Sequence, residues 1–305
     1  MNDSTPDFSS FRSGYVAIVG WPNVGKSTLL NSLLGFKLSI VSAKPQTTRE
    51  AILGIINEAK SQLIFLDTPG WLSPDDNFRS YMRRAIMRSL YDDADIILWV
   101  LESKPLTPEQ IYFAEGLAKT NKPLFVVFNK MDAGVSEEVM ASVTAELKKC
   151  FPGEIRSFVL SAKTGQGVRP LRQALLTQLP FSPPYFPTDQ LTDRWERFYV
   201  RELIREQIFE MFHQEIPHAA AVLLEEFVEK EGRKDHIRAN IIVETDGQKN
   251  IILGKKGSSI KRLGQQSREE IEKRLGRPVY LDLYIKVKKN WRKDSAFLKQ
   301  LMEEA

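Results

Sequence analysis

The chain has 305 residues, 42% of them hydrophobic, and 43 lysines and arginines against 39 aspartates and glutamates, a formal net charge of +4. This length favours two folded domains over one. Cys150 is the only cysteine, so the chain forms no internal disulfide and suits a reducing compartment. No apolar stretch approaches the roughly 18 residues of a membrane span. We expect a soluble, cytoplasmic protein.

The first part of the chain alternates short apolar runs with amphipathic helical patterns. This alternation is typical of a mainly parallel sheet with helices on both faces. The link at 57–61 is too short for a crossover helix, so the strands on either side of it should form a hairpin with one antiparallel edge strand. The expected strands span residues 15–19, 51–56, 62–66, 96–101, 124–128 and 157–160.

A proline-rich stretch divides the chain. Four prolines fall within eight residues, which excludes a continuous helix or a central strand there; they are Pro180, Pro183, Pro184 and Pro187. We therefore expect an N-terminal arm at 1–14, a first domain at 15–179, a linker at 180–192 and a second domain at 193–305.

The second domain has a different order of elements. Apolar residues recur at helical spacing over about 193–212, and strand-like segments follow near 220–229 and 236–245. A helix, a tight turn at 254–257 and a second helix come next, and Gly276 should end that second helix. From Val279 to Val287 apolar and polar residues alternate as in a half-buried strand. The predicted order is α-β-β-α-α-β.

A phosphate-binding loop follows the first predicted strand. The run GWPNVGKS matches the P-loop pattern and opens a helix. In such a loop Lys26 reaches the β- and γ-phosphates and the Ser27 hydroxyl binds magnesium. The phosphate-binding candidates are Gly20, Trp21, Pro22, Asn23, Val24, Gly25, Lys26, Ser27 and Thr28.

Two further segments should respond to the γ-phosphate and its metal ion. Asp67 ends the third strand, where open α/β sheets place their ligands, and can order magnesium through water. Thr47 or Thr48 lies between the first helix and the second strand and could bind the same ion. The candidates after the strand are Asp67, Thr68, Pro69 and Gly70, whose last amide could sense the γ-phosphate.

Two motifs indicate a guanine base. Asp132, in the run NKMD after an apolar strand, can accept hydrogen bonds from guanine N1 and its exocyclic amine, a pattern that adenine does not offer. The run Ser161-Ala162-Lys163 follows the last strand and offers backbone amides to the guanine carbonyl. The base-binding candidates are Asn129, Lys130, Asp132, Ser161, Ala162 and Lys163. With the motifs in this order, GTP and GDP are the predicted ligands.

On these motifs the chain resembles the Era family of bacterial ribosome-assembly GTPases, within the TrmE-Era-EngA-like group, over nearly all its length. The resemblance implies an α/β P-loop GTPase domain with a mostly parallel sheet, followed by an α+β type II KH domain. It also implies GTP hydrolysis, with Lys26, Thr47, Thr48 and Gly70 as catalytic candidates. Some relatives with the P-loop asparagine use potassium, so Asn23 is either a K⁺ ligand or a residue that shapes the loop. Trp71 replaces the glutamine of Ras-like switches and is more typical of packing than of catalysis.

Charge concentrates near the end of the chain. Residues 248–293 hold 14 basic and four acidic side chains, which favours a phosphate-bearing partner. The run Gly254-Lys255-Lys256-Gly257 matches the GxxG loop of a KH domain, which clamps about four nucleotides of single strand. The RNA-binding candidates are Ile251, Ile252, Gly254, Lys255, Lys256, Gly257, Lys261, Lys288, Lys289 and Trp291. Trp291 could offer a stacking ring, although the run 286–293 is equally typical of a solvated edge.

The family resemblance implies that the RNA is the 3′ end of 16S ribosomal RNA and that the larger partner is the 30S subunit, which the protein would bind as a monomer. The leading hypothesis is a GTP-hydrolysing switch that controls RNA affinity. One alternative is an RNA-binding module in which the nucleotide is only a structural ligand. Another is a signalling GTPase bound peripherally to the anionic inner membrane surface through its basic edge.

Overall fold

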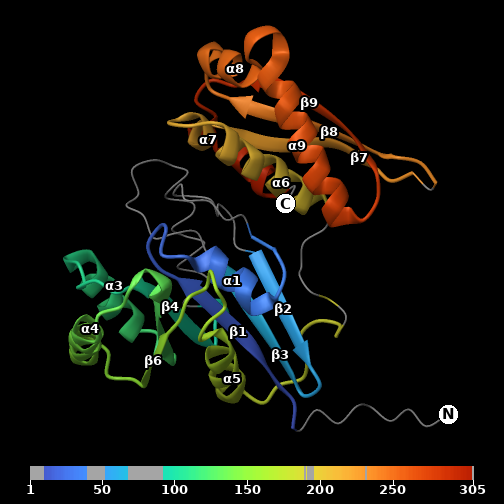
Figure 1. Ribbon diagram of the computed structural model, residues 1–305. Helices are drawn as coiled ribbons and strands as arrows, with labels where there is room; N and C mark the ends of the chain where they lie inside the picture. Colours follow the sequence, from blue (N-terminus) through green and yellow to red (C-terminus); the bar gives the residue numbers. More distant parts are fainter. Residues whose placement is uncertain are drawn as a thin grey trace, which may run out of the picture. The chain divides into compact units, whose positions relative to one another are not determined.

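The computed structural model describes residues 10–39, 52–67, 92–188, 190, 196–230 and 232–303. The chain divides into two compact units (Figure 1). Among the described residues, those up to Gln190 belong to the first unit, and those from Glu196 onward belong to the second. Each unit has its own sheet and its own hydrophobic core.

The first unit is built on a six-stranded sheet in the order β2-β3-β1-β4-β5-β6. Only β2 is antiparallel to its neighbour, which confirms the predicted edge hairpin. The central strands are buried along nearly their whole length, as expected of a parallel sheet covered on both faces. The strands are β1 Arg12–Val19, β2 Ile52–Glu58, β3 Ser61–Asp67, β4 Ile96–Glu102, β5 Leu124–Asn129 and β6 Ile155–Val159.

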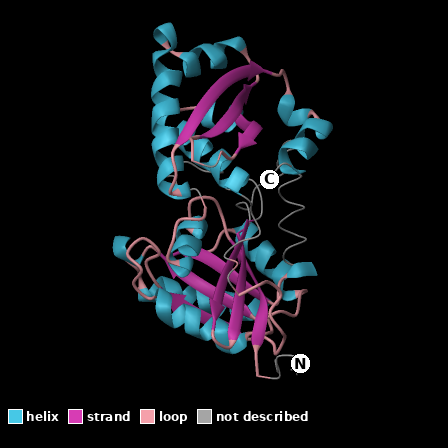
Figure 2. Cartoon of the chain, turned by 90° about the vertical axis from the view of Figure 1, so that its right-hand side faces the viewer, coloured by secondary structure: helices cyan, strands magenta, loops and turns pink. Residues whose placement is uncertain are grey.

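Helices of the first unit cover both faces of this sheet (Figure 2). α3 and α4 contact each other and share a core cluster with Trp99 and Phe128 on one face. α1 and α5 contact each other and β3. Their bounds are α1 Lys26–Leu34, α3 Pro108–Ala118, α4 Glu137–Cys150 and α5 Val168–Gln178.

Most of the proline-rich segment is hydrogen-bonded to the first unit. Gln62 is fully buried, and its Oε1 accepts hydrogen bonds from the amides of Tyr185 (2.8 Å) and Phe186 (2.9 Å). Its Nε2 donates to the Phe186 carbonyl (2.8 Å) and to Asn57 Oδ1 (2.7 Å). Asn57 Nδ2 in turn donates to the Gln190 carbonyl (2.8 Å). The segment expected to be a linker is therefore held against the β2–β3 hairpin as far as Gln190.

The start of the chain is also drawn into the sheet. β1 begins at Arg12, so residues 12–14, expected in the arm, are part of a strand. The reason is a set of backbone contacts: the Arg12 amide donates to the Lys60 carbonyl (3.0 Å), and Arg12 pairs with Phe181 in an isolated bridge. A sequence pattern cannot reveal such distant partners.

The second unit contains a three-stranded sheet in the order β7-β8-β9. β7 and β8 are antiparallel, whereas β8 and β9 are parallel and are joined through two helices, which confirms the predicted α-β-β-α-α-β order. Gly276 ends α9 with φ 68°, as expected. The elements are α6 Glu196–Met211, α7 Ile216–Ala219, β7 Ala221–Val228, β8 Asp235–Val243, α8 Asp246–Leu253, α9 Ser258–Leu275, β9 Val279–Val287 and α10 Ser295–Glu303.

Candidate functional site

The P-loop connects β1 to α1. Gly25, with φ 98°, is the residue before α1, and a Cβ there would lie 2.3 Å from Asn129 Nδ2, so only glycine fits. Asn23 also has a positive φ of 65°, a conformation that asparagine tolerates. The Trp21 ring packs edge-on against Phe113, with 5.5 Å between the ring centroids. Its indole is therefore part of the hydrophobic packing of the first unit.

Lys26 is the first residue of α1, and its side chain reaches back to the loop. It is 7% exposed, and its Nζ donates hydrogen bonds to the carbonyls of Gly20 (3.1 Å) and Trp21 (2.9 Å). Burial lowers the pKa of Lys26 to about 8, and the nearby Asp67 carboxylate offsets part of this shift. The ammonium group is thus held in a poorly hydrated place, where an added anion would stabilise its charged form.

Asp67 is fully buried at the end of β3. Its Oδ2 accepts hydrogen bonds from the Ser27 hydroxyl (3.2 Å) and from the Ser39 hydroxyl (2.8 Å). The predicted pair Ser27 and Asp67 is thus brought together. Ser39 was not among the predicted site residues, because no nucleotide motif includes it.

Asn129 joins two loops at the ends of the sheet. It is 3% exposed, its Nδ2 donates to the Val24 carbonyl (2.8 Å), and its Oδ1 accepts from the Ala162 amide (2.9 Å). The Ala162 amide, one of the three expected to be available to the guanine carbonyl, therefore donates to Asn129 instead. The P-loop and the Ser-Ala-Lys loop are fixed relative to each other by this one side chain.

Asp132 and Ser161 form the next part of the site. Ser161 Oγ donates to Asp132 Oδ1 (2.6 Å), and this hydrogen bond is the main cause that lowers the pKa of the exposed Asp132 carboxyl. Lys130 has φ 67° and forms an ion pair with Glu102 at the end of β4. The carboxylate of Asp132 is thus ionised, oriented and accessible.

Several predicted residues fall outside the described part of the chain. They are Thr47, Thr48, Thr68, Pro69, Gly70 and Trp71. Their expected roles stay predictions.

The GKKG turn lies between α8 and α9 of the second unit. Gly254 has φ 71°, and a Cβ there would lie 2.2 Å from Ser259 Oγ, so the close approach requires glycine. Lys255, Lys256 and Lys261 are exposed around the turn. Ile251 and Leu253, on the short helix before the turn, are 54% and 38% exposed. Leu253 therefore also offers apolar surface beside the turn, although it was not among the predicted RNA contacts. Cationic and apolar groups therefore flank one turn.

Two of the predicted RNA contacts are wrong. Ile252 is fully buried in the core of the second unit, so it has no surface to offer a base. Trp291 is also fully buried: its Nε1 donates to the Ala219 carbonyl (3.0 Å), and its ring packs against Phe297. It therefore cannot stack on RNA.

Two of the four basic side chains that follow β9, Lys288 and Arg292, form ion pairs. Lys288 lies 2.8 Å from Asp294 and over the Phe297 ring, and Arg292 pairs with Glu244. Lys289 is exposed. The pairing favours a structural role for these two side chains over a continuous phosphate track.

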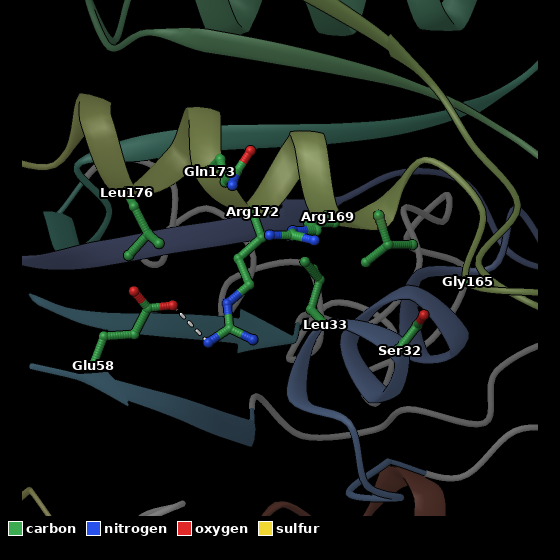
Figure 3. Close-up of a pocket in the computed structure, with 9 residues that line it drawn as sticks. Ser32, Leu33, Glu58, Gly165, Arg169, Arg172, Gln173 and Leu176 are labelled. Atoms are coloured by element: carbon green, nitrogen blue, oxygen red, sulfur yellow. Dashed lines mark hydrogen bonds and ion pairs between the residues drawn. The ribbon is translucent and has the colours of Figure 1, made fainter.

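A separate cavity of about 560 Å³ lies between α1 and α5 (Figure 3). Across it Arg172 on α5 pairs with Glu58 at the end of β2, with 2.7 Å between Nη2 and Oε1. This pair fastens the hairpin to α5. The lining residues are Ser32, Leu33, Glu58, Gly165, Val168, Arg169, Arg172, Gln173 and Leu176.

Comparison with known proteins agrees with both units. A model of the 50S ribosome-binding GTPase family matches residues 15–130, and a KH-domain model matches residues 215–292. The chain is 41% identical to GTPase Era of Carboxydothermus hydrogenoformans over 292 residues, which is 95% of this chain and 97% of the relative. It is 42% identical to GTPase Era of Lactobacillus delbrueckii subsp. bulgaricus over 294 residues, or 96% of each protein.

Two solved structures resemble the whole chain. A variant of Aquifex aeolicus Era bound to GDP·AlF4⁻ has a TM-score of 0.89 and 38% identity, covering 97% of this chain and 100% of that one. Era in complex with MgGDPNP and nucleotides 1506–1542 of 16S ribosomal RNA has the same TM-score and identity, covering 97% and 99%. Together, the geometry of the site and the family matches define the molecule as a GTP-hydrolysing P-loop protein with a C-terminal KH domain. The chain belongs to the Era family of GTPases.

Proposed function

We propose that this GTPase is a magnesium-dependent switch whose KH domain binds single-stranded RNA, the 3′ end of 16S ribosomal RNA, during assembly of the 30S subunit. The observation that carries the proposal is the pairing of a guanine-nucleotide site with an exposed GKKG turn in one chain. A related protein has been solved with both a magnesium-bound GTP analogue and that region of 16S RNA.

The phosphate end of the nucleotide binds at the P-loop. Lys26 exchanges its two carbonyl partners for β- and γ-phosphate oxygens, and the N-terminus of α1 favours the same negative charge. Placing a cation where charge develops in the transition state lowers the barrier to phosphoryl transfer. The Gly70 amide completes the γ-phosphate contacts, and Thr47 or Thr48 binds the magnesium ion.

The chemistry of the donors suits magnesium. Ser27 offers a hydroxyl oxygen as a ligand, and the Asp67 carboxylate, with its Oδ2 3.2 Å from Ser27 Oγ, can accept hydrogen bonds from the ion's water shell; Mg²⁺ prefers oxygen ligands and keeps several waters. When bound, the ion neutralises charge on the phosphate oxygens. Asn23, exposed in the P-loop, is a candidate K⁺ ligand, which hydrolysis rates in KCl against NaCl at equal ionic strength would test.

The base end of the nucleotide binds at Asp132. Its carboxylate accepts hydrogen bonds from guanine N1 and the exocyclic amine, and the Ser161 hydroxyl keeps it in place. Among the three backbone amides of the Ser-Ala-Lys run, that of Lys163 donates to no other described residue, so it faces the guanine carbonyl.

The RNA backbone passes the GKKG turn. Lys255 and Lys256 contact phosphates, while Ile251 and Leu253 offer apolar surface to the bases. Lys261, one turn into α9, extends the cationic surface along the strand.

The hydrogen bonds of Gln62 and Asn57 support coupling between the two sites. They fasten the chain segment that leads to the second unit onto the β2–β3 hairpin. β2 follows the segment that holds Thr47 and Thr48, and β3 ends at Asp67. We therefore expect a rearrangement on hydrolysis, either of the segment before β2 or of the segment after β3, to act on the β2–β3 hairpin. This hairpin holds the proline-rich segment as far as Gln190.

The test is RNA affinity in two nucleotide states. RNA that ends with the 3′ sequence of 16S ribosomal RNA should bind with different affinity when the protein holds GDPNP and when it holds GDP. Equal affinity in both states, together with no acceleration of single-turnover hydrolysis by 30S subunits, would favour an RNA-binding module with a structural nucleotide. Flotation with anionic vesicles that RNA does not compete away would favour the membrane-bound alternative.

A further inference from the structure

The segment after α1 is held in place by Asn31. Asn31 Oδ1 accepts hydrogen bonds from the amides of Leu38 (2.7 Å) and Ser39 (2.9 Å), and its Nδ2 donates to the Ser39 carbonyl (2.9 Å). Ser39 is 1% exposed. Three hydrogen bonds from one side chain therefore fix the backbone of Leu38 and Ser39, and with it the direction of the Ser39 hydroxyl.

That hydroxyl is aimed at the candidate magnesium site. Ser39 Oγ donates to Asp67 Oδ2 over 2.8 Å, a shorter distance than the 3.2 Å from Ser27 Oγ to the same oxygen. Asp67 is fully buried, and a buried carboxylate needs strong donors to remain charged. Two donors on one oxygen also fix the rotation of the carboxylate about its Cβ–Cγ bond.

We infer that Ser39 is a positioning residue for the bound magnesium ion, and that Asn31 acts through it. Ser39 holds the Asp67 carboxylate so that it meets the water shell of a Mg²⁺ ion bound at Ser27. Residues that hydrogen-bond to metal-binding groups, without contacting the metal themselves, tune metal affinity by orienting those groups. The inference rests on the proposed magnesium site.

The test is the rate at which GDP with a fluorescent ribose label leaves the full-length protein as free Mg²⁺ is varied. Removing the hydroxyl in Ser39→Ala should raise the Mg²⁺ concentration needed for half-maximal slowing by about 10-fold or more. The rate in excess EDTA should stay close to wild type, because the phosphate and base contacts are unchanged. Ser32→Ala, on the same helix as Asn31 but lining the cavity beside α5, is the matched control and should not shift the midpoint.

Asn31→Ala should shift the Mg²⁺ midpoint in the same direction. The double variant should shift it no further than the larger single change, because both residues act through one hydroxyl. If Ser39→Ala keeps the wild-type midpoint while remaining folded, or if the two single shifts add, the inference is overturned. If wild-type GDP release does not depend on Mg²⁺ at all, the magnesium assignment itself fails.

Discussion

Asn129 Nδ2 donates a hydrogen bond to the Val24 carbonyl over 2.8 Å, joining β5 to the middle of the P-loop. With its Oδ1 accepting from Ala162, this side chain bridges the loop that meets the phosphates and the loop that meets the base. The spacing between the two ends of the nucleotide site thus depends on one buried amide.

Replacing Asn129 with alanine should weaken both the fold and GTP binding. The Val24 carbonyl and the Ala162 amide lose their partner at about 1–3 kcal/mol each, so the free energy of unfolding should fall by about 2–6 kcal/mol. Urea unfolding and GTP titration would measure the two effects. Asn129→Asp keeps the acceptor for Ala162 but sets a carboxylate against the Val24 carbonyl, so it should also lose GTP affinity. Wild-type affinity in both variants would contradict the bridging role.

Changing Asp132 to asparagine should shift the base preference from guanine toward xanthine, because the amide donates where the carboxylate accepted. The loss of a charge-assisted hydrogen bond predicts GTP affinity lower by about 10- to 100-fold. Competition between GTP and xanthosine triphosphate would measure the change. Unaltered GTP affinity would show that Asp132 does not bind the base.

GTP binding should be accompanied by proton uptake at pH values near the pKa of Lys26. Because burial lowers this pKa to about 8, part of the population is neutral in the unliganded protein at pH 8. Phosphate charge raises the pKa of the bound lysine, so affinity should fall as pH rises through about 8 and stay level below about pH 7. Calorimetry in buffers of different ionisation enthalpy should show uptake at pH 8 and little at pH 6.5. Equal heats across buffers at pH 8 would refute the prediction.

Truncating the Gln62 side chain should weaken the attachment of the proline-rich segment to the β2–β3 hairpin. Gln62→Ala leaves the amides of Tyr185 and Phe186 and the Phe186 carbonyl without their partner, so we expect about 2–4 kcal/mol lower stability. Protease should also cut the segment 181–190 faster. The control Gln173→Ala, exposed on α5, should change stability by less than about 0.5 kcal/mol. An equal response of the two variants would remove the role assigned to Gln62.

The sequence predicts the strands and motifs because apolar runs and glycine spacing are local signals. The roles of Ser39 and Gln62 depend on partners far along the chain, which no local pattern contains. Ile252 and Trp291 fail for a related reason. α8 has only eight residues, too few for periodicity to show which of Ile251 and Ile252 faces outward, and Trp291 lies in a turn whose burial is set by α7 and α10.

No helix among the residues that the structure describes is long and apolar enough to cross a membrane. Exposed basic side chains such as Lys289 offer positive charge both to anionic lipid and to RNA phosphates. Vesicle binding measured with and without RNA separates these two uses of the basic surface.

The central claim is that one chain carries two separable sites, and the double variant Lys255→Asp/Lys256→Asp tests it most directly. Negative charge at the GKKG turn should repel a phosphate backbone, while Gly254 and Gly257 keep the turn. RNA affinity should fall, with a shallower dependence on salt because fewer phosphates are contacted. GTP affinity, measured on the same protein, should stay at the wild-type value. RNA binding at wild-type strength, or joint loss of RNA and GTP binding in a folded protein, would contradict the account.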